Sequence, residues 1–136
     1  MSGKVDEEMD VVAAIIEKDG RILITRRKEG SFMAGRWEFP GGKIEAGETS
    51  EQALEREIRE ELAVEIAVGV LFHAGKYINP VGQKKRLVRL MCYKSRIISG
   101  KIECIGCSEY KWVLSRELAG YDFVDGDVEV VKKLMA

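Results

Sequence analysis

The stretch GGKIEAGETSEQALEREIREEL, residues 41–62, decides the fold, because it joins a glycine-rich segment to a helix that is rich in glutamate. Thr49 and Gln52 have the spacing of a capping box, which predicts a helix that begins directly after Thr49. At about 100° per residue, the apolar side chains of this helix fall on one stripe, made up of Leu54, Ile58 and Leu62. The stripe predicts one buried face, and the helix should end near Leu62 or Ala63.

Three glutamates share the neighbouring face of this helix: Glu57, Glu60 and Glu61, at the spacing i, i+3 and i+4. Like charges at this spacing repel by roughly a few tenths of a kcal/mol per pair, so a compensating charge is expected. One interpretation is a solvent-exposed face on which Arg56 and Arg59 offset the acids. The other is a site for a hard cation, because Mg²⁺ and Mn²⁺ bind carboxylates, water and phosphate oxygens together.

The glycine pair Gly41-Gly42 in front of the helix favours the cation site. A backbone without Cβ atoms can approach a ligand closely and present its carbonyl and amide groups. The segment is not a P-loop, because the spacing G-x-x-x-x-G-K-[ST] is absent. The glycines therefore indicate a binding loop of another kind.

The rest of the chain reads as strands with two further short helices. At 136 residues the sequence predicts one domain, 1–136, in which residues 1–9 form a flexible N-terminus. Residues 28–43 read as a loop. Apolar runs separated by turn residues predict strands over 10–17, 21–27, 64–77, 86–98 and 110–114. A brief helix is expected over 115–118, and Asp125 or Asp127 should cap a last helix. Strands mixed with helices predict an α+β fold, in which helices pack on a mainly antiparallel sheet.

Composition excludes several classes of protein. The 22 basic and 23 acidic residues nearly cancel, which gives no whole-chain attraction for nucleic acid or a membrane surface. No apolar run is long enough for a signal peptide or a membrane span, so a cytoplasmic location is expected. Cys92, Cys104 and Cys107 cannot all pair with one another, and we expect reduced thiols. A zinc site is disfavoured, because His73 is the only histidine; it lies in an apolar strand and should be a packed residue.

The spacing around the acidic helix resembles a known signature. Gly42 and Glu48, followed by the run REIREELAV at 56–64, have the spacing of the Nudix hydrolase motif G-x5-E-x7-R-E-U-x-E-E-x-G-U, where U is bulky and aliphatic. One position departs from it: Ala63 replaces the last glycine, which alters the turn that leaves the helix.

The resemblance extends over residues 10–134. ITRR at 24–27, WEFPGGKIEAGET at 37–49 and YKWVLSREL at 110–118, with an aspartate near the last helix, are similar to the MutT-like branch of the family. Within that branch they resemble in particular the CTP pyrophosphohydrolase and 8-oxo-dGTP diphosphatase members. The resemblance implies a Nudix-type α/β/α sandwich with a mixed, mainly antiparallel sheet.

The same resemblance implies an activity: hydrolysis of a nucleoside triphosphate, CTP, dCTP or an oxidised nucleotide, to a nucleoside monophosphate and pyrophosphate. It implies Mg²⁺ as cofactor, with Mn²⁺ as a substitute, because an acidic site can bind phosphates only through metal ions. The metal ligands it implies are Gly41, Glu57, Glu60 and Glu61. Arg56 would hold the loop through Glu48, and Glu57, ahead of Glu60, would be the general base. The catalytic set is therefore Glu57, Glu60 and Arg56.

Substrate-binding residues follow in the same way, and they are Arg27, Glu38, Phe39, Pro40 and Asp127. Phe39 suits either the core or a platform for the base. An ionised Asp127 could accept a hydrogen bond from the amino group of cytosine, and the alternative is that it caps the last helix. The partner is a nucleotide rather than a nucleic acid polymer or a membrane, and both a monomer and a homodimer remain open.

A second departure concerns Gly106-Cys107, where similar enzymes often carry Glu-His. Glu103 or Glu109 could replace the missing acid, and the sequence does not choose between them. A non-catalytic nucleotide sensor is therefore an alternative from another class, and a structural domain with a solvated acidic helix is a third. The intact glutamate trio opposes the sensor, and the Gly-Gly spacing opposes the structural domain.

Overall fold

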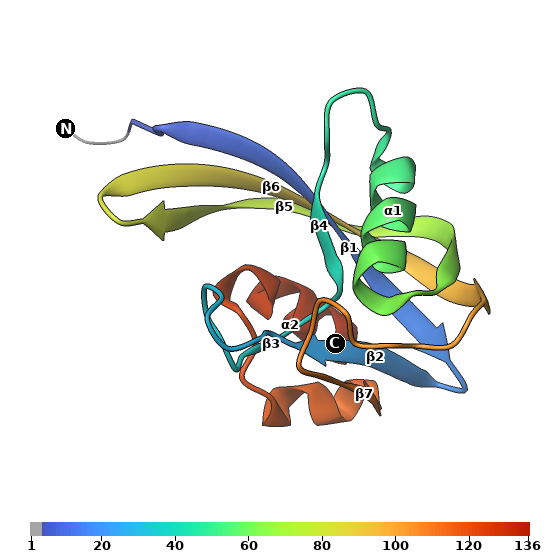
Figure 1. Cartoon of the computed structure of the whole chain (residues 1–136). Helices are drawn as coiled ribbons and strands as arrows, with labels where there is room; N and C mark the ends of the chain where they lie inside the picture. The colour runs from blue at the N-terminus through green and yellow to red at the C-terminus, as the bar shows by residue number, and fades with distance from the viewer. Residues whose placement is uncertain (1–3) are drawn as a thin grey trace.

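A computed structural model describes residues 4–136 and shows a chain of alternating strand and helix layers (Figure 1). The elements in chain order are β1 (Glu7–Lys18), β2 (Arg21–Arg26), β3 (Trp37–Glu38), β4 (Gly41–Lys43), α1 (Ser50–Leu62), β5 (Glu65–Val81), β6 (Lys84–Ser99), β7 (Glu109–Val113), the 3₁₀ helices η1 (Ser115–Gly120) and η2 (Asp125–Asp127), and α2 (Val128–Met135). Within residues 4–136, no helix combines the length and apolar character needed to cross a membrane.

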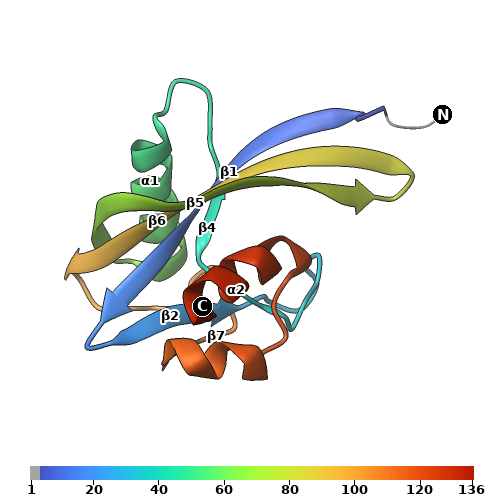
Figure 2. The same cartoon turned by 180° about the vertical axis from the view of Figure 1, so that it is seen from behind.

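The sheet is mixed, as predicted. Its main order is β3-β2-β1-β6-β5, and β4 pairs with β1 while β7 pairs with β2. β1 and β6 run parallel, from the pair Glu7–Arg86 to the pair Ile16–Ser95, and the other named pairs are antiparallel. α1 and α2 lie on opposite sides of β1 in both views (Figures 1 and 2). The predicted α/β/α sandwich is confirmed.

The core explains why β1 is apolar on both faces. Alternate residues of a strand point to opposite sides of its sheet, so β1 contributes to two separate clusters. One cluster packs against the predicted stripe of α1 and comprises chiefly Val12, Ala14, Ile16, Leu54, Ile58 and Leu62. The other packs against α2 and comprises chiefly Ala13, Ile15, Phe39, Leu90, Phe123 and Val130. A strand buried on both faces fixes α1 and the segment around Phe39 to the same sheet.

α1 begins and ends as predicted. Thr49 caps it with a full capping box: its side chain accepts from the Gln52 N–H at 3.1 Å, and the Gln52 side chain accepts from the Thr49 N–H at 3.0 Å. Ala63 closes the helix in the left-handed conformation, with φ 60° and ψ 28°. The residue that departs from the glycine of the motif therefore adopts the glycine-like geometry itself, which strains an alanine.

The start of β1 and the segment before α1 differ from the sequence predictions. β1 begins at Glu7, so part of the expected flexible segment 1–9 is a strand; residues 1–3 lie outside the described residues. Glu7 is held there by Arg86, whose Nη2 lies 2.9 Å from Glu7 Oε1. The expected loop 28–43 contains β3 and β4, which are too short to show a strand period in sequence.

The expectation of three reduced thiols is also wrong. Cys104 and Cys107 form a disulfide, with Cα atoms 5.1 Å apart, and Cys92 is free and buried. Domain size and cysteine count indicate only whether a domain needs a disulfide for stability. They carry no information on the loop after β6, which turns sharply against the end of α1 and brings the two sulfur atoms together.

Candidate active site

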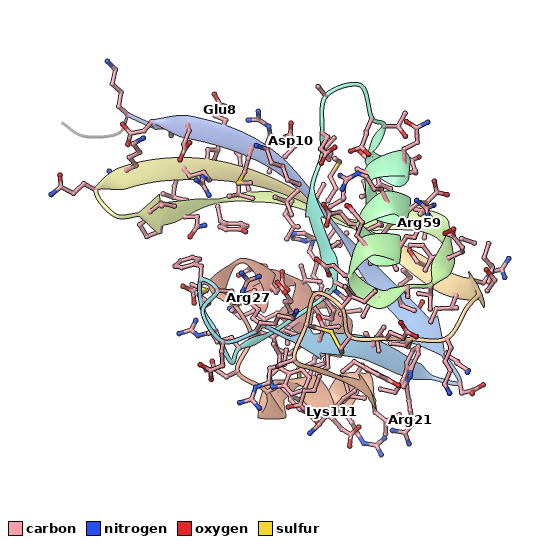
Figure 3. All side chains as sticks on the ribbon, viewed as in Figure 1. Glu8, Asp10, Arg21, Arg27, Arg59 and Lys111 are labelled. Atoms are coloured by element: carbon pink, nitrogen blue, oxygen red, sulfur yellow. A yellow bond between two sulfur atoms is a disulfide. The ribbon has the colours of Figure 1, made fainter. Side chains whose placement is uncertain are left out.

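A cleft of about 360 Å³ lies between the extended β5–β6 hairpin and the segments around residues 27–39 and 124–127. It brings together four of the five predicted substrate residues and one predicted metal ligand: Arg27, Glu38, Phe39, Asp127 and Gly41. Arg27, labelled in Figure 3, points into the space beneath the hairpin. Pro40 is buried and does not line the cleft; its carbonyl accepts from the Ala14 N–H at 2.8 Å.

The cleft ends at the glycine pair of β4, which pairs with the middle of β1. A Cβ atom on Gly41 would overlap the carbonyl oxygen of Val12, so this position admits no side chain. A Cβ atom on Gly42 would overlap the carboxylate of Glu57. The absence of side chains at both positions brings the backbone of the cleft floor directly against the acidic face of α1.

Arg56 organises that acidic face. Its Nε lies 2.6 Å from Glu48 Oε2, and its Nη1 lies 2.9 Å from Glu57 Oε1 and 3.1 Å from Glu60 Oε1. Its Nη2 also donates to the Lys43 carbonyl at 3.0 Å. The expected link from Arg56 to the loop through Glu48 is therefore present, and one guanidinium joins the helix, the loop and the end of β4.

The carboxylates of α1 form a set of hard oxygen donors. Burial, together with the negative charges of Glu38 and Glu57, raises the pKa of Glu61 to about 8, although the charge of Arg27 and a backbone hydrogen bond with Gly41 oppose this. Burial also raises the pKa of Glu57, against the hydrogen bond from Arg56. In both acids the effect of burial outweighs that of the neighbouring guanidinium groups, and a divalent cation bound by the carboxylates would lower the pKa values again. The donor chemistry therefore fits Mg²⁺ or Mn²⁺.

The carboxylates of α1 do not converge on a single point in this structure. Across residues 4–136, no three acidic, histidine or cysteine side chains are grouped closely enough to hold one ion. Glu57 and Glu60 instead turn to Arg56, whose positive charge lies between them. The pKa of Glu61 responds to the charges of Glu38, Glu57 and Arg27, so Glu61 lies within range of both the helix acids and the cleft wall.

The cleft wall beside Glu61 holds an ion pair. Arg27 Nη1 lies 3.1 Å from Glu38 Oε1 and 3.2 Å from Glu38 Oε2, and both side chains are only partly exposed. Burial raises the pKa of Glu38, although the charge and the hydrogen bond of Arg27 oppose this. Arg27, directly after β2, is therefore one of the cationic residues that line the cleft.

Asp127 is buried at the inner wall of the cleft. Its Oδ2 accepts from the backbone N–H of Phe39 at 3.0 Å, and its side chain makes no capping hydrogen bond to α2. Burial raises the pKa of Asp127 to about 7, against the lowering effect of that N–H. Phe39 stacks on Phe123 with ring centroids 5.2 Å apart and also lines the cleft. Phe39 thus belongs to the core and to the site.

The hairpin supplies residues that the sequence did not single out. Tyr77 and Asn79 line the cleft from β5, and burial together with the charge of Asp127 raises the pKa of Tyr77 to about 12. A Cβ atom on Gly126 would overlap the ring of Tyr77, so the two segments touch. The sequence predicts a strand that includes Tyr77, but it does not indicate that this strand packs against the segment around Gly126.

The other residues considered from sequence lie elsewhere. His73 is buried in β5 with its Nδ1 2.8 Å from Lys133 Nζ, as expected of a packed residue. Glu109 pairs with Arg26 at 3.0 Å, and the side chain of Glu103 is exposed. Gly106 packs against Glu61, where an added Cβ would lie 3.0 Å from Glu61 Cγ. The position of the missing acid is therefore close to Glu61 but carries no side chain.

The family of the chain is shown by its similarity to known proteins. Residues 7–134 match the model of the NUDIX domain. The chain belongs to the Nudix hydrolase family. Both the family resemblance and the hydrolase class predicted from the sequence are confirmed.

The relatives of this Nudix hydrolase include nucleotide hydrolases. It is 35% identical over 128 residues to the CTP pyrophosphohydrolase of Escherichia coli (strain K12), which covers 94% of this chain and 92% of that protein. It is 36% identical over 118 residues to the putative 8-oxo-dGTP diphosphatase 2 of Mycobacterium tuberculosis (strain ATCC 25618 / H37Rv), with 86% and 81% covered. The solution structure of the E. coli ORF135 protein superposes with a TM-score of 0.79 at 34% identity, covering 95% of this chain and 89% of that one.

Proposed function

We propose that this Nudix hydrolase is a Mg²⁺-dependent nucleoside triphosphate pyrophosphohydrolase that prefers CTP or dCTP and releases a nucleoside monophosphate and pyrophosphate. The observation that carries the proposal is the contact of Gly42 with Glu57, because it joins the floor of the cleft to the acidic face of α1. Phe39 and Gly42 are three positions apart, which is roughly 10 Å of extended chain. That length suits a base beside Phe39 and phosphates beside Gly42.

Different residues along this length would bind the base, the phosphates and the metal ion. Asp127 and Phe39 would bind the base, and Arg27 would bind phosphate oxygens. Gly41, Glu57, Glu60 and Glu61 would hold Mg²⁺. When bound, the cation would polarise the phosphoryl oxygens and lower the pKa of a water molecule. Glu57, which lies 2.9 Å from Arg56 and against Gly42, would orient that water or accept its proton.

A second candidate substrate is 8-oxo-dGTP. One relative carries that activity in its name, and the pKa of Asp127 gives a physical reason to consider it. With a pKa of about 7, a fraction of Asp127 is protonated near neutral pH and can donate a hydrogen bond to an oxo group. The ionised form, which only accepts, favours the amino group of cytosine instead.

A substrate panel tests the proposal. CTP, dCTP, UTP, dGTP and 8-oxo-dGTP would be incubated with Mg²⁺, with Mn²⁺ and with a chelator, and the products separated by ion-exchange chromatography. We expect monophosphate and pyrophosphate, with CTP or dCTP consumed fastest and no turnover in chelator. Nucleotide binding without turnover would support the sensor instead, and release of inorganic phosphate with a diphosphate would contradict the proposed bond cleavage.

The remaining parts of the proposal are the cellular location and the oligomeric state of the enzyme. A nucleoside triphosphate substrate agrees with the cytoplasmic location expected from the sequence. The oligomeric state, monomer or homodimer, can be measured in the same preparation by light scattering.

A further inference from the structure

The disulfide lies in the loop that holds the end of the acidic helix. The backbone N–H groups of Ile105 and Gly106 both donate to the carbonyl of Glu61, at 2.9 and 3.1 Å, and the Glu103 N–H donates to the Leu62 carbonyl at 3.0 Å. Carbonyls in the last turn of a helix lack partners within the helix. The loop therefore satisfies the end of α1 at the residue that carries one of the site's carboxylates.

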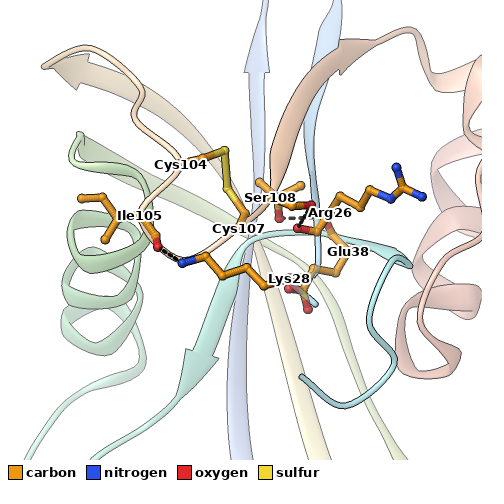
Figure 4. Close-up of a disulfide and its surroundings, with 8 residues drawn as sticks. Arg26, Lys28, Glu38, Cys104, Ile105, Cys107 and Ser108 are labelled. Atoms are coloured by element: carbon orange, nitrogen blue, oxygen red, sulfur yellow. Dashed lines mark hydrogen bonds between the residues drawn. A yellow bond between two sulfur atoms is a disulfide. The ribbon is translucent and has the colours of Figure 1, made fainter. Parts of the chain in front are cut away.

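The same loop is tied to the other side of the site. The Ser108 N–H donates to the Arg26 carbonyl at 2.9 Å, and Lys28 Nζ donates to the Ile105 carbonyl (Figure 4). Arg26 ends β2 directly before Arg27, which lines the cleft. The loop thus connects the segment that carries Arg27 to the turn that carries Glu61, and Cys104 and Cys107 fix its curvature.

The two cysteine residues differ in their exposure. Cys107 is 5% exposed and belongs to the core cluster beside α1, whereas Cys104 packs at the edge of the same cluster and is only partly buried. A reductant in solution can therefore approach Cys104 Sγ, with Cys107 as the leaving thiolate. The spacing of the pair, C-x-x-C, is also that of thiol–disulfide exchange motifs.

We propose that Cys104 and Cys107 form a reversible redox site that exchanges with dithiols, and that its oxidised state holds the loop rigid against the end of α1. In the exchange, one thiolate of the dithiol attacks Cys104 Sγ and breaks the bond to Cys107, which takes up a proton. The second thiolate of the dithiol then displaces Cys104, which is also protonated. The protein gains two electrons and two protons, and the dithiol becomes a disulfide.

The site accounts for a disulfide in a protein expected in a reducing compartment, since cytosolic disulfides are usually transient and catalytic or redox-sensing. It also gives a role to the position where similar enzymes often carry Glu-His. In place of an acidic side chain near Glu61, this chain has a glycine that packs on Glu61 and a cysteine that fastens the loop.

The first test counts thiols. The whole protein would be equilibrated in mixtures of dithiothreitol and its oxidised form, quenched in acid, unfolded and labelled with a maleimide, and the labels counted by mass. We expect one label, on Cys92, under oxidising conditions and three under reducing conditions, in a single two-thiol step. Three labels at every ratio would overturn the proposal. Cys92→Ala is the matched control and should show zero and two labels.

The second test follows the loop by amide hydrogen exchange. Reduction should speed exchange at Ile105 and Gly106 at least about tenfold, because the loop loses its covalent constraint. The amide of Ala53, which bonds to Thr49 at the other end of α1, serves as the internal control and should not change. Thermal unfolding of the reduced protein should begin roughly 3–5 °C lower. A disulfide whose reduction leaves both amides unchanged would refute its coupling to α1.

A variant distinguishes the loss of the disulfide from other effects of the reductant. Cys104→Ser leaves the buried Cys107 in place, should exchange at Ile105 and Gly106 like the reduced protein, and should no longer respond to dithiothreitol. Exchange in this variant at the rate of the oxidised protein would contradict the proposal. None of these measurements uses nucleotide hydrolysis. Their outcome is therefore independent of whether the proposed function is correct.

Discussion

The carboxylate of Asp127 accepts a hydrogen bond of 3.0 Å from the backbone N–H of Phe39, which lies 88 positions earlier in the chain. This bond connects the start of the last helix to the segment before the glycine pair. It also occupies one oxygen of a buried side chain and leaves the other for a ligand in the cleft. The selectivity and the pH response of the enzyme should both depend on this relationship.

Base selectivity is the first prediction. When ionised, Asp127 can accept from the amino group of cytosine, whereas uracil would present a carbonyl to it. One such bond to a charged group contributes roughly 1.5–3 kcal/mol, so kcat/KM for CTP should exceed that for UTP at least about tenfold at pH 8. Asp127→Asn should reduce the ratio without abolishing turnover. Equal rates on CTP and UTP, or an unchanged ratio in the variant, would show that another group reads the base.

Stability against pH is the second prediction. The folded Asp127 holds its proton up to a pKa of about 7, whereas the unfolded chain releases it near 3.8. The folded state therefore binds more protons between these values, and the stabilising contribution is lost as pH rises through the window. Relative to Asp127→Asn, the free energy of unfolding should fall by roughly 2 kcal/mol from pH 5 to pH 8, measured by urea denaturation without metal. Parallel pH profiles for the two proteins would contradict the shift.

The acidic face of α1 gives the third prediction. Glu57→Gln and Glu61→Gln should each lower kcat at least about a hundredfold, because each removes a proposed metal ligand or base. The fold should persist, since neither side chain belongs to the apolar core. Glu51→Gln, the same change at an exposed position of α1, is the control and should retain activity. Near-wild-type turnover in both test variants would restore the interpretation of a solvated face.

A fourth prediction concerns the missing acid. Glu109 is fixed by Arg26 at 3.0 Å, and we expect Glu109→Ala to weaken activation by Mg²⁺ modestly, roughly two- to fivefold. Glu103→Ala should have a smaller effect, because that side chain is exposed. Titration of activity with Mg²⁺ in both variants is the measurement. The absence of any effect at either position would mean that α1 and Gly41 suffice.

The end of α1 offers a change that should stabilise the protein. Ala63 has φ 60°, a conformation that disfavours alanine by roughly 1 kcal/mol relative to glycine. Ala63→Gly should therefore raise the free energy of unfolding by about 1 kcal/mol, which is roughly 3 °C in Tm for a domain of this size. Thermal unfolding followed by circular dichroism would detect it. A lower Tm would show that the surrounding loop compensates for the strain.

Local patterns predicted what depends on local physics. The capping box of Thr49 and the stripe of Leu54, Ile58 and Leu62 sufficed for α1, because both features lie within the helix itself. The strands of the hairpin were predicted in part for the same reason. The sequence did not predict the extension of β5 to Val81. Residues 78–81 are a strand because they pair with residues 84–87, and this pairing leaves no pattern in the sequence.

The site could be predicted only where the family pattern reaches. The positions of Gly41, Glu57 and Glu61 follow from a motif whose spacing is fixed by one loop and one helix. The contact of Tyr77 with Gly126 and the disulfide between Cys104 and Cys107 depend on how distant segments pack. Sequence periodicity carries no information on such packing. The cysteine count and the domain size favoured reduced thiols instead.

The parallel pairing of β1 with β6 also determines when the site can form. Residues 7–16 pair with residues 86–95, so each paired position is 79 residues from its partner. Contacts over such separations form slowly, because a long loop must close before they contribute. During synthesis, the edge of β1 that pairs with β6 must therefore wait for more than half of the chain, and until then it is open to association with other nascent chains.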